Sequence, residues 1–79
     1  MMVVEIITPT NNIFSGTVQR IKLPGSKGEF EMLHNHAPII STLDAGKIVL
    51  FDEHGKKHDF DISGGVVEQA QNKVIVLVD

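Results

Sequence analysis

Two histidines separated by one residue, His34 and His36, are the side chains of this chain best suited to metal binding. Residues at i and i+2 lie on the same face of a β-strand, so the two imidazoles could approach one ion. Neutral imidazole is a common ligand of zinc and of iron. The pair therefore makes a metal site the first chemical hypothesis to weigh.

The residues around this pair match only half of a known metal signature. Gly28, His34 and His36 have the spacing of the first half of the cupin signature. That half continues to a glutamate, but Ile40 and Ser41 stand in its place, and the second half, Pro-x-Gly followed by histidine, is missing. Two histidines alone hold a metal poorly, so the simpler interpretation is that they bond to backbone groups at a corner. A small cupin-like metal-dependent enzyme remains the alternative to the function inferred below.

A second candidate is the glycine pair Gly25 and Gly28, which has the G-x-x-G spacing of the nucleic-acid clamp in KH domains. The KH loop joins two helices, whereas the residues on either side of this pair predict strands. No glycine-rich stretch leads into a helix whose N-terminus could bind phosphate. The pattern therefore indicates a tight β-turn.

The carboxylates give no catalytic arrangement. Glu29 and Glu31 share one face of a short predicted strand, where acidic side chains ordinarily form the exposed side of a sheet. No serine, histidine and acidic residue form a recognisable set, and without cysteine there is no thiolate. We therefore expect no catalytic residue, no cofactor and no metal ion.

The composition limits the remaining classes of function. With 79 residues, the chain predicts a single domain over 1–79, and a core this small often depends on a partner for stability. A net charge of −3 and the lack of tryptophan and tyrosine argue against nucleic-acid binding. The longest apolar run, Val74 to Val78, is too short to span a bilayer, and no signal peptide is recognisable. We expect a soluble chain that reaches a membrane only through other proteins.

The pattern that must position these residues is one of short alternating stretches separated by turn residues. Eight to ten strands are predicted, which indicates an all-β sandwich or barrel. Gly16 is expected to break the strand near Phe14, and the slip in alternation between Val18 and Ile21 predicts a β-bulge. Helix competes only over 39–50, where β-branched residues and Gly46 weigh against it. The other predicted strands are Val3–Thr8, Thr17–Leu23, Glu29–Leu33, Ile39–Leu43, Lys47–Phe51, Lys57–Ser63, Val66–Gln69 and Lys73–Val78.

The chain contains six short motifs in one order and spacing. They are Phe14-Ser-Gly16, Pro24-Gly25-x-x-Gly28-Glu-Phe30, His36-Ala-Pro38-Ile-Ile-Ser-x-Leu43, Gly46, Ser63-Gly-Gly65-Val-Val-Glu68 and Asn72-x-Val-x-Val-Leu77. Together they resemble the epsilon subunit of F-type ATP synthases, which mitochondria call delta. Each motif is weak alone, but the match as a whole runs from about Val3 to Asp79. The resemblance implies a flattened sandwich of two antiparallel sheets with about ten short strands.

The resemblance also implies a mechanical function without chemistry. Such a subunit lies in the central rotor stalk and couples gamma to the c ring during proton-driven ATP synthesis, on the cytoplasmic face of a bacterial inner membrane. The implied c-ring contact is the turn of Gly25, Ser26, Lys27, Gly28, Glu29 and Phe30. The positions matching the gamma contact are Thr8, His36 and Ser41.

This chain departs from the family pattern in two local positions and in length. His34-Asn35 replaces the common Pro-Gly before His-Ala-Pro, and Glu31 stands where glycine or a small residue is frequent. Most members continue into two C-terminal helices, which inhibit ATP hydrolysis in many bacteria and bind ATP in some. The sequence here ends at its last predicted strand, so the resemblance implies the β-sandwich domain without that helical domain and its roles.

Overall fold

The computed structural model describes residues 1–34 and 37–79, and the described residues form eight β-strands. In chain order these are β1 (Met2–Ile7), β2 (Asn12–Gly25), β3 (Gly28–Leu33), β4 (Ile39–Leu43), β5 (Gly46–Asp52), β6 (Lys57–Ile62), β7 (Gly65–Ala70) and β8 (Lys73–Val78). In the described part of the chain, no helix is long and apolar enough to cross a membrane.

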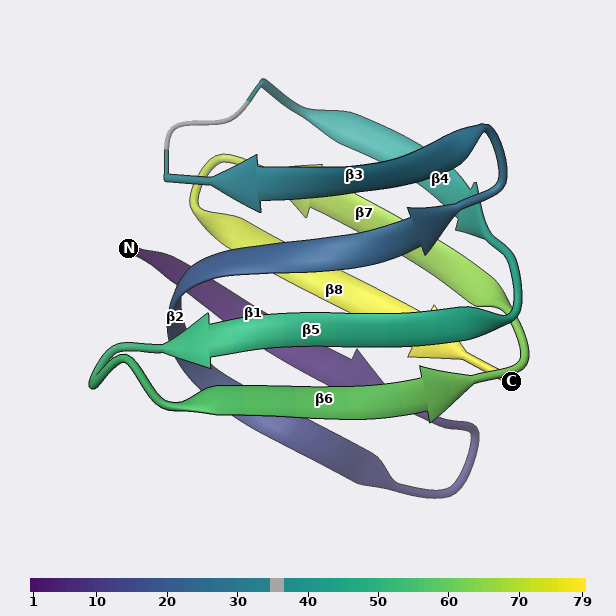
Figure 1. Cartoon of the computed structure of the whole chain (residues 1–79), viewed down its shortest axis with the longest axis horizontal. Helices are drawn as coiled ribbons and strands as arrows, with labels where there is room; N and C mark the ends of the chain where they lie inside the picture. Colours follow the sequence, from purple (N-terminus) through teal and green to yellow (C-terminus); the bar gives the residue numbers. More distant parts are fainter. Residues whose placement is uncertain (35–36) are drawn as a thin grey trace.

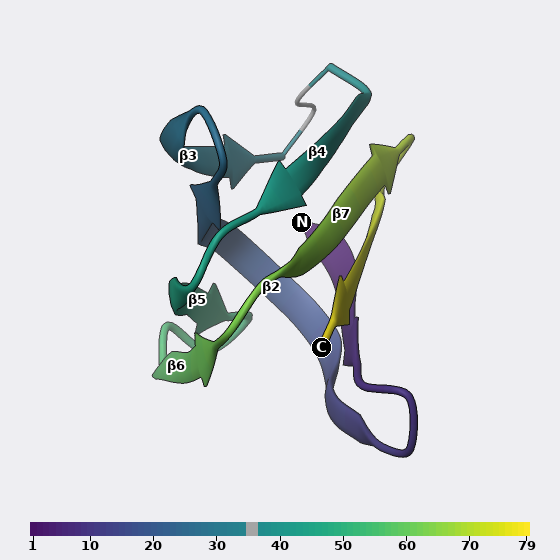
Figure 2. The ribbon, with the colours of Figure 1, turned by 90° about the vertical axis from the view of Figure 1, so that its right-hand side faces the viewer.

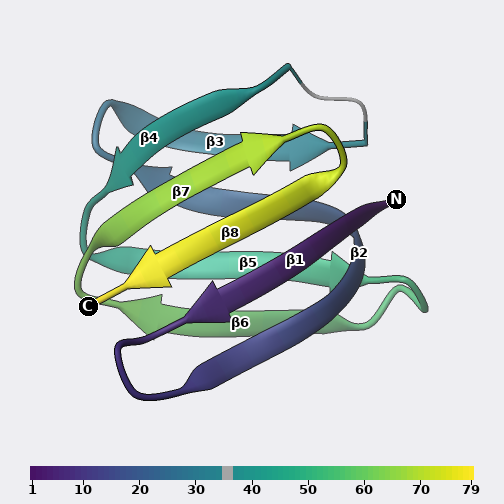
Figure 3. The same ribbon diagram turned by 180° about the vertical axis from the view of Figure 1, so that it is seen from behind.

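The strands form two layers that share β2 (Figure 1). Residues 12–18 of β2 pair with β1, and the back layer continues through β8 and β7 to β4. Residues 20–25 pair with β3 on one side, while 18–22 pair with β5, which leads to β6 in the front layer. Figure 2 shows the layers edge-on, with β5 and β6 on one side and β7 and β8 on the other; Figure 3 shows the back layer.

The prediction of an all-β sandwich is confirmed, with differences in detail. Gly16 does not break a strand, because it pairs with Val4 and β2 continues through it from Asn12 to Gly25. The predicted bulge is present, since the register of β2 against β5 shifts between Val18 and Arg20, where β2 passes from one layer to the other. One pair, β1 with β8, is parallel; the other pairings are antiparallel among the described residues.

The core between the layers follows from alternation along each strand. Buried and exposed residues alternate in β1 and β8, as the period of two for a strand requires. Full burial of one such valine, leucine or isoleucine stabilises the fold by about 1.5–3 kcal/mol. The buried apolar residues are Met2, Val4, Ile6, Val18, Ile21, Leu23, Met32, Leu43, Ile48, Leu50, Val67, Val74, Val76 and Val78.

An aromatic cluster closes the open side of the sandwich between β6 and the first half of β2. The Phe14 ring meets the ring of His58 edge-on, with centroids 5.4 Å apart, and that of Phe60 at 6.0 Å. Asp52 fixes His58, because its Oδ2 lies 2.8 Å from the imidazole Nε2. The other oxygen of Asp52 accepts the backbone N–H groups of His54 and Lys56, each at 2.9 Å. One carboxylate thus joins the β5–β6 hairpin to the cluster.

These contacts make the stability of the domain sensitive to acid. The hydrogen bond from His58, with those from Lys56 and His54, lowers the pKa of Asp52 from 3.8 to about 2. The carboxylate therefore contributes stability that is present above about pH 4 and is lost as the pH falls to about 2. We expect Asp52→Asn to lower the urea concentration at the midpoint of unfolding at pH 6. At pH 2 the difference between the midpoints of the variant and the wild type should be smaller, because the wild-type carboxylate is then partly protonated.

The matched control for this experiment is Asp59→Asn, which changes an exposed carboxylate on β6. Its unfolding midpoint should follow the wild-type value at both pH values. Equal behaviour of the Asp52 and Asp59 variants at pH 6 would contradict the role assigned to Asp52.

A close approach of two backbones explains a glycine at the start of β7. A Cβ at Gly65 would collide with the carbonyl oxygen of Leu77 on β8, so no larger residue fits without moving that strand. We expect Gly65→Ala to destabilise the domain by about 2 kcal/mol and to lower Tm by about 10 °C. Gly16→Ala is the control, because its Cβ would meet only the Phe14 ring at 3.4 Å. Calorimetry showing equal Tm values for the two variants would contradict the packing argument.

Candidate interaction surface

The turn between β2 and β3 has the geometry of a two-residue hairpin. Ser26 and Lys27 lie between Gly25 and Gly28, which form the last pair of the β2–β3 ladder. The φ angle of Gly28 is +125°, a conformation that residues with a side chain rarely adopt. Gly28 therefore closes the tight β-turn that the sequence indicates, and Lys27 and Glu29 on either side of it are exposed.

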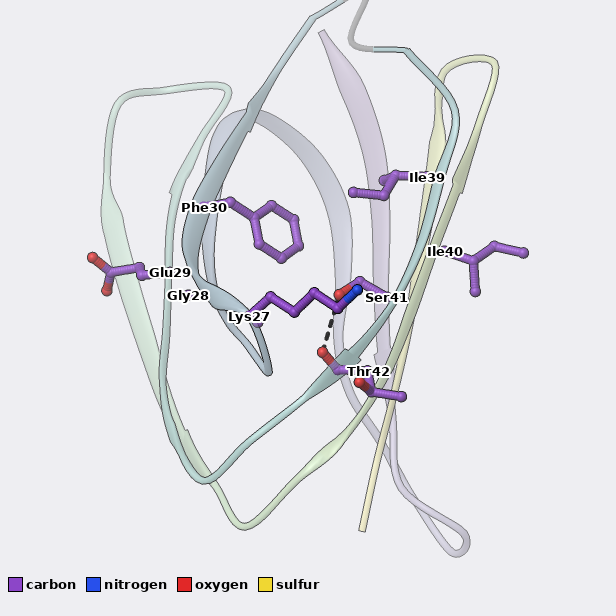
Figure 4. Close-up of a pocket in the computed structure, with 9 residues that line it drawn as sticks. Lys27, Gly28, Glu29, Phe30, Ile39, Ile40, Ser41 and Thr42 are labelled. Carbon is purple, nitrogen blue, oxygen red and sulfur yellow. Dashed lines mark hydrogen bonds between the residues drawn. The ribbon is translucent and has the colours of Figure 1, made fainter.

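A groove of about 670 Å³ separates this turn from β4 (Figure 4). Phe30 from β3 and Ile39 from β4 point toward each other across it, so its floor is apolar. Lys27 extends across the mouth of the groove toward Ser41, while Ile40 points away. The groove thus brings Ser41, predicted to face gamma, beside the turn predicted to face the c ring.

The two charged residues of the turn differ in their surroundings. Glu29 points away from the groove, and one of its oxygens lies 4.0 Å from Nζ of Lys22. Both of these side chains are substantially exposed, so the pair contributes little to stability. Lys27 makes no ion pair with the described residues. Each charge is therefore available to a partner at little cost to the fold.

Thr8 lies in a different part of the molecule and has a local structural role. Its Oγ1 accepts the backbone N–H of Asn11 at 2.9 Å and donates to the carbonyl oxygen of Asn11 at 3.2 Å. These bonds shape the loop after β1, as threonine commonly does in turns. Thr8 and Ser41 are not brought together, because β8 and β7 lie between β1 and β4.

The back layer has an apolar outer face that the sequence analysis did not identify. Ile7, Leu77 and Val66 stand opposite one another on adjacent strands, and with Thr8 they border a depression of about 480 Å³. Leu77 is 53% exposed and Ile40, on β4, is 73% exposed. Consecutive apolar residues such as Ile39-Ile40 could have signalled this face, because neighbours in a strand point to opposite sides.

The outer face of the front layer is charged and internally paired. Arg20 lies 3.5 Å from a carboxylate oxygen of Glu31 and 4.1 Å from the centre of the Phe51 ring. Lys47 on β5 lies 3.8 Å from Asp61 on β6. Because large exposed apolar patches mark interaction sites, the back face is the better candidate for a broad protein contact.

The structure does not test the metal hypothesis for the pair of histidines, because only His34 of the two is described. Asn35 and His36 lie outside the described residues, so the predicted roles of His36 are not tested. Nδ1 of His34 lies 3.1 Å from the amino group of Met1. Across residues 1–34 and 37–79, no group of three or more histidine, cysteine or acidic side chains is arranged to hold a metal ion.

The whole chain matches a known protein family. The family model described as "ATP synthase, Delta/Epsilon chain, beta-sandwich domain" matches residues 1–79. The chain belongs to this family. The resemblance inferred from the six motifs is thereby confirmed, and no observation favours the cupin-like alternative.

Curated relatives in this family are named ATP synthase epsilon chain. The relative from Campylobacter concisus is 47% identical over 76 residues, which cover 95% of this chain and 58% of the relative. That from Desulfatibacillum aliphaticivorans is 41% identical over 99% of this chain and 55% of its own length. The chain therefore spans somewhat more than half of these relatives.

Solved structures confirm the fold of the delta/epsilon β-sandwich. A chain of the Euglena gracilis mitochondrial ATP synthase, from a structure of OSCP, F1 and c-ring, superposes with a TM-score of 0.88 at 22% identity. The match covers 98% of this chain and 49% of that one. A chain from the central stalk and c-ring of the Tetrahymena thermophila enzyme gives a TM-score of 0.78 at 21% identity, covering 98% and 62%.

The local role of Thr8 can be separated from a role in partner binding. We expect Thr8→Val to destabilise the isolated domain by about 1 kcal/mol, because the loop loses its hydroxyl acceptor and donor. Thr8→Ser keeps the hydroxyl and should unfold at the wild-type urea concentration. Wild-type stability of the valine variant would show that the loop does not depend on these hydrogen bonds.

Proposed function

We propose that residues 1–79 form one epsilon-type β-sandwich domain that couples gamma to the c ring in the central rotor stalk of an F-type ATP synthase. The family match over the whole of 1–79 is the observation that carries this proposal. The names of the relatives, and the central stalk and c-ring contents of the similar structures, support it. In this function the domain is non-catalytic and carries no cofactor.

The mechanism we infer is mechanical. When the c ring turns, the domain resists displacement between ring and gamma, so that torque passes to gamma. A sandwich suits this function because its backbone hydrogen bonds run continuously between neighbouring strands, and β2 joins both layers. The named relatives are bacterial, which supports a location at the cytoplasmic face of the inner membrane, held there through the complex.

The two partners would use different parts of the surface. The protruding turn from Gly25 to Phe30 suits the polar loops of a c ring, with Glu29 accepting hydrogen bonds from a basic or amide group. Thr8 and Ser41, together with the apolar back face, suit a broad contact with gamma, and His36 is proposed for the same contact by resemblance. Apolar burial would supply most of the affinity there, and charges at the edge would set orientation.

The charge of Glu29 provides the test of the ring contact. We expect Glu29→Lys to weaken retention of the domain on purified c rings severalfold, because a hydrogen-bond acceptor becomes a like charge for a basic partner. The melting temperature should change little, since Glu29 is exposed and only weakly paired. Pull-down with immobilised c ring and a thermal melt measure the two effects.

Asp61→Lys is the matched control, because it reverses the charge of a carboxylate that is 86% exposed on β6, a strand that β2 and β5 separate from β3. This variant should be retained on the ring as the wild type is. Equal retention of wild type and Glu29→Lys would rule out Glu29 as a ring contact. Failure of the wild type itself to bind either ring or gamma would rule out the proposed function.

A further inference from the structure

A chain of side-chain hydrogen bonds links the β2–β3 turn to the end of β4 and to the first residue after it. The Thr42 hydroxyl donates to Oγ of Ser26 at 2.8 Å. The Ser26 hydroxyl donates in turn to Oδ1 of Asp44 at 3.0 Å. These partners are 16 and 18 residues apart in the sequence, so the bonds join segments that local structure would not bring together. We call Ser26, Thr42 and Asp44 the turn clasp.

Two backbone hydrogen bonds surround the turn clasp. The N–H of Ser26 donates to the Thr42 carbonyl oxygen at 3.0 Å, and the N–H of Asp44 donates to that of Pro24 at 2.9 Å. They flank the pair Gly25 and Leu43, the single position at which β2 pairs with β4 in the described chain. In the described chain, these two bonds are the backbone attachment between β2 and β4, so rotation of one strand against the other is opposed only near this pair. The side-chain bonds provide the additional points of attachment that oppose this motion.

We propose that Ser26 is a positioning residue, whose hydroxyl fixes the β2–β3 turn against β4 through Thr42 and Asp44. The turn clasp sets the separation of the turn from β4 and so the direction in which Lys27 and Glu29 are presented. The bond to Asp44 has an ionised acceptor, which makes it stronger than a bond between neutral groups. The effect on a c ring rests on the proposed function, whereas the clasp itself is a property of this domain.

The geometry of the groove depends on the same attachment. Lys27 follows Ser26 directly, and its side chain extends across the mouth of the groove toward Ser41 (Figure 4). Release of the Ser26 hydroxyl would let Lys27 and Glu29 move relative to β4 without disturbing the buried core, because the clasp residues are exposed. The clasp therefore affects presentation of the turn more than global stability.

Hydrogen exchange on the isolated chain tests the clasp directly. The variants are Ser26→Ala, Asp44→Ala and the double variant. In each protein, NMR measures the hydrogen-exchange rates of the backbone amides at positions 26 and 44. Asp44→Ala removes one of the two clasp bonds and should accelerate their exchange about fivefold, which corresponds to loss of one hydrogen bond. Ser26→Ala removes both bonds and should accelerate exchange at least as much. The double variant should exchange no faster than Ser26→Ala, because that substitution already removes the bond to Asp44.

Three further variants distinguish the effect of losing the clasp hydrogen bonds from the effect of a general loss of domain stability. Ser26→Thr and Asp44→Asn retain a hydroxyl and an acceptor oxygen, so they should restore slow exchange. Asp61→Ala removes an exposed carboxylate outside the clasp and should leave exchange unchanged. Unchanged exchange in the single alanine variants, or multiplied effects in the double variant, would overturn the proposal.

Retention on purified c rings gives the functional readout. Ser26→Ala and Asp44→Ala should be retained less well than Asp61→Ala at equal Tm, and Ser26→Thr should recover retention. Faster exchange with unchanged retention would overturn the role of the clasp in presenting the turn. If the wild type fails to bind the ring, the proposed function fails, while the exchange experiment still decides whether the clasp exists.

Discussion

Strand β2 hydrogen-bonds to β1 along its first half and to β3 and β5 along its second half, so both layers are built on one continuous backbone. The bulge after Val18 lets the strand change direction between the layers while its side chains continue to face the core. Val18 and Ile21, on either side of this change, are both fully buried. The bulge in β2 therefore sets the orientation of one layer relative to the other, and with it the positions of the surfaces on both layers.

The two outer faces then differ for a reason that lies in their sequences. Strands of the front layer place paired charges outward, such as Arg20 with Glu31 and Lys47 with Asp61. Strands of the back layer place branched apolar residues on both sides, as in Val76 and Leu77 of β8. The back face carries an ion pair too, Glu5 with Lys73 at 3.1 Å, but its exposed apolar residues make it the less well solvated of the two. The asymmetry gives the domain one face suited to solvent and one suited to another protein.

Alternation along short segments was sufficient to predict the strands and most of the core. Lys57–Ile62 alternates in burial as its sequence indicates, and Phe30 and Met32 share a face. The prediction of a strand break at Gly16 was wrong because this glycine pairs with Val4 on β1. The two residues are distant in the sequence, so local patterns do not reveal their pairing. The β1–β8 pair is likewise invisible to local patterns, since parallel partners can be distant in sequence.

The interaction surface could be predicted less completely than the fold. The turn was identified from Gly25 and Gly28, whose spacing demands a tight reversal. Ser26, Thr42 and Asp44 gave no signal, because their hydrogen bonds exist only once the two layers have come together. The resemblance places Thr8 at a partner contact, but the sequence does not show the hydrogen bonds that Thr8 makes within its own loop.

The parallel pair of β1 and β8 also has a consequence for how the domain is made. Strand β1 is synthesised before β8, so one of its edges stays uncovered until β8 is made, although β2 can pair with its other edge early. Such distant partners raise contact order and slow the search for the native topology. During synthesis, one edge of β1 therefore has unpaired backbone groups, which can pair with other chains and cause aggregation, until residues 73–78 are available.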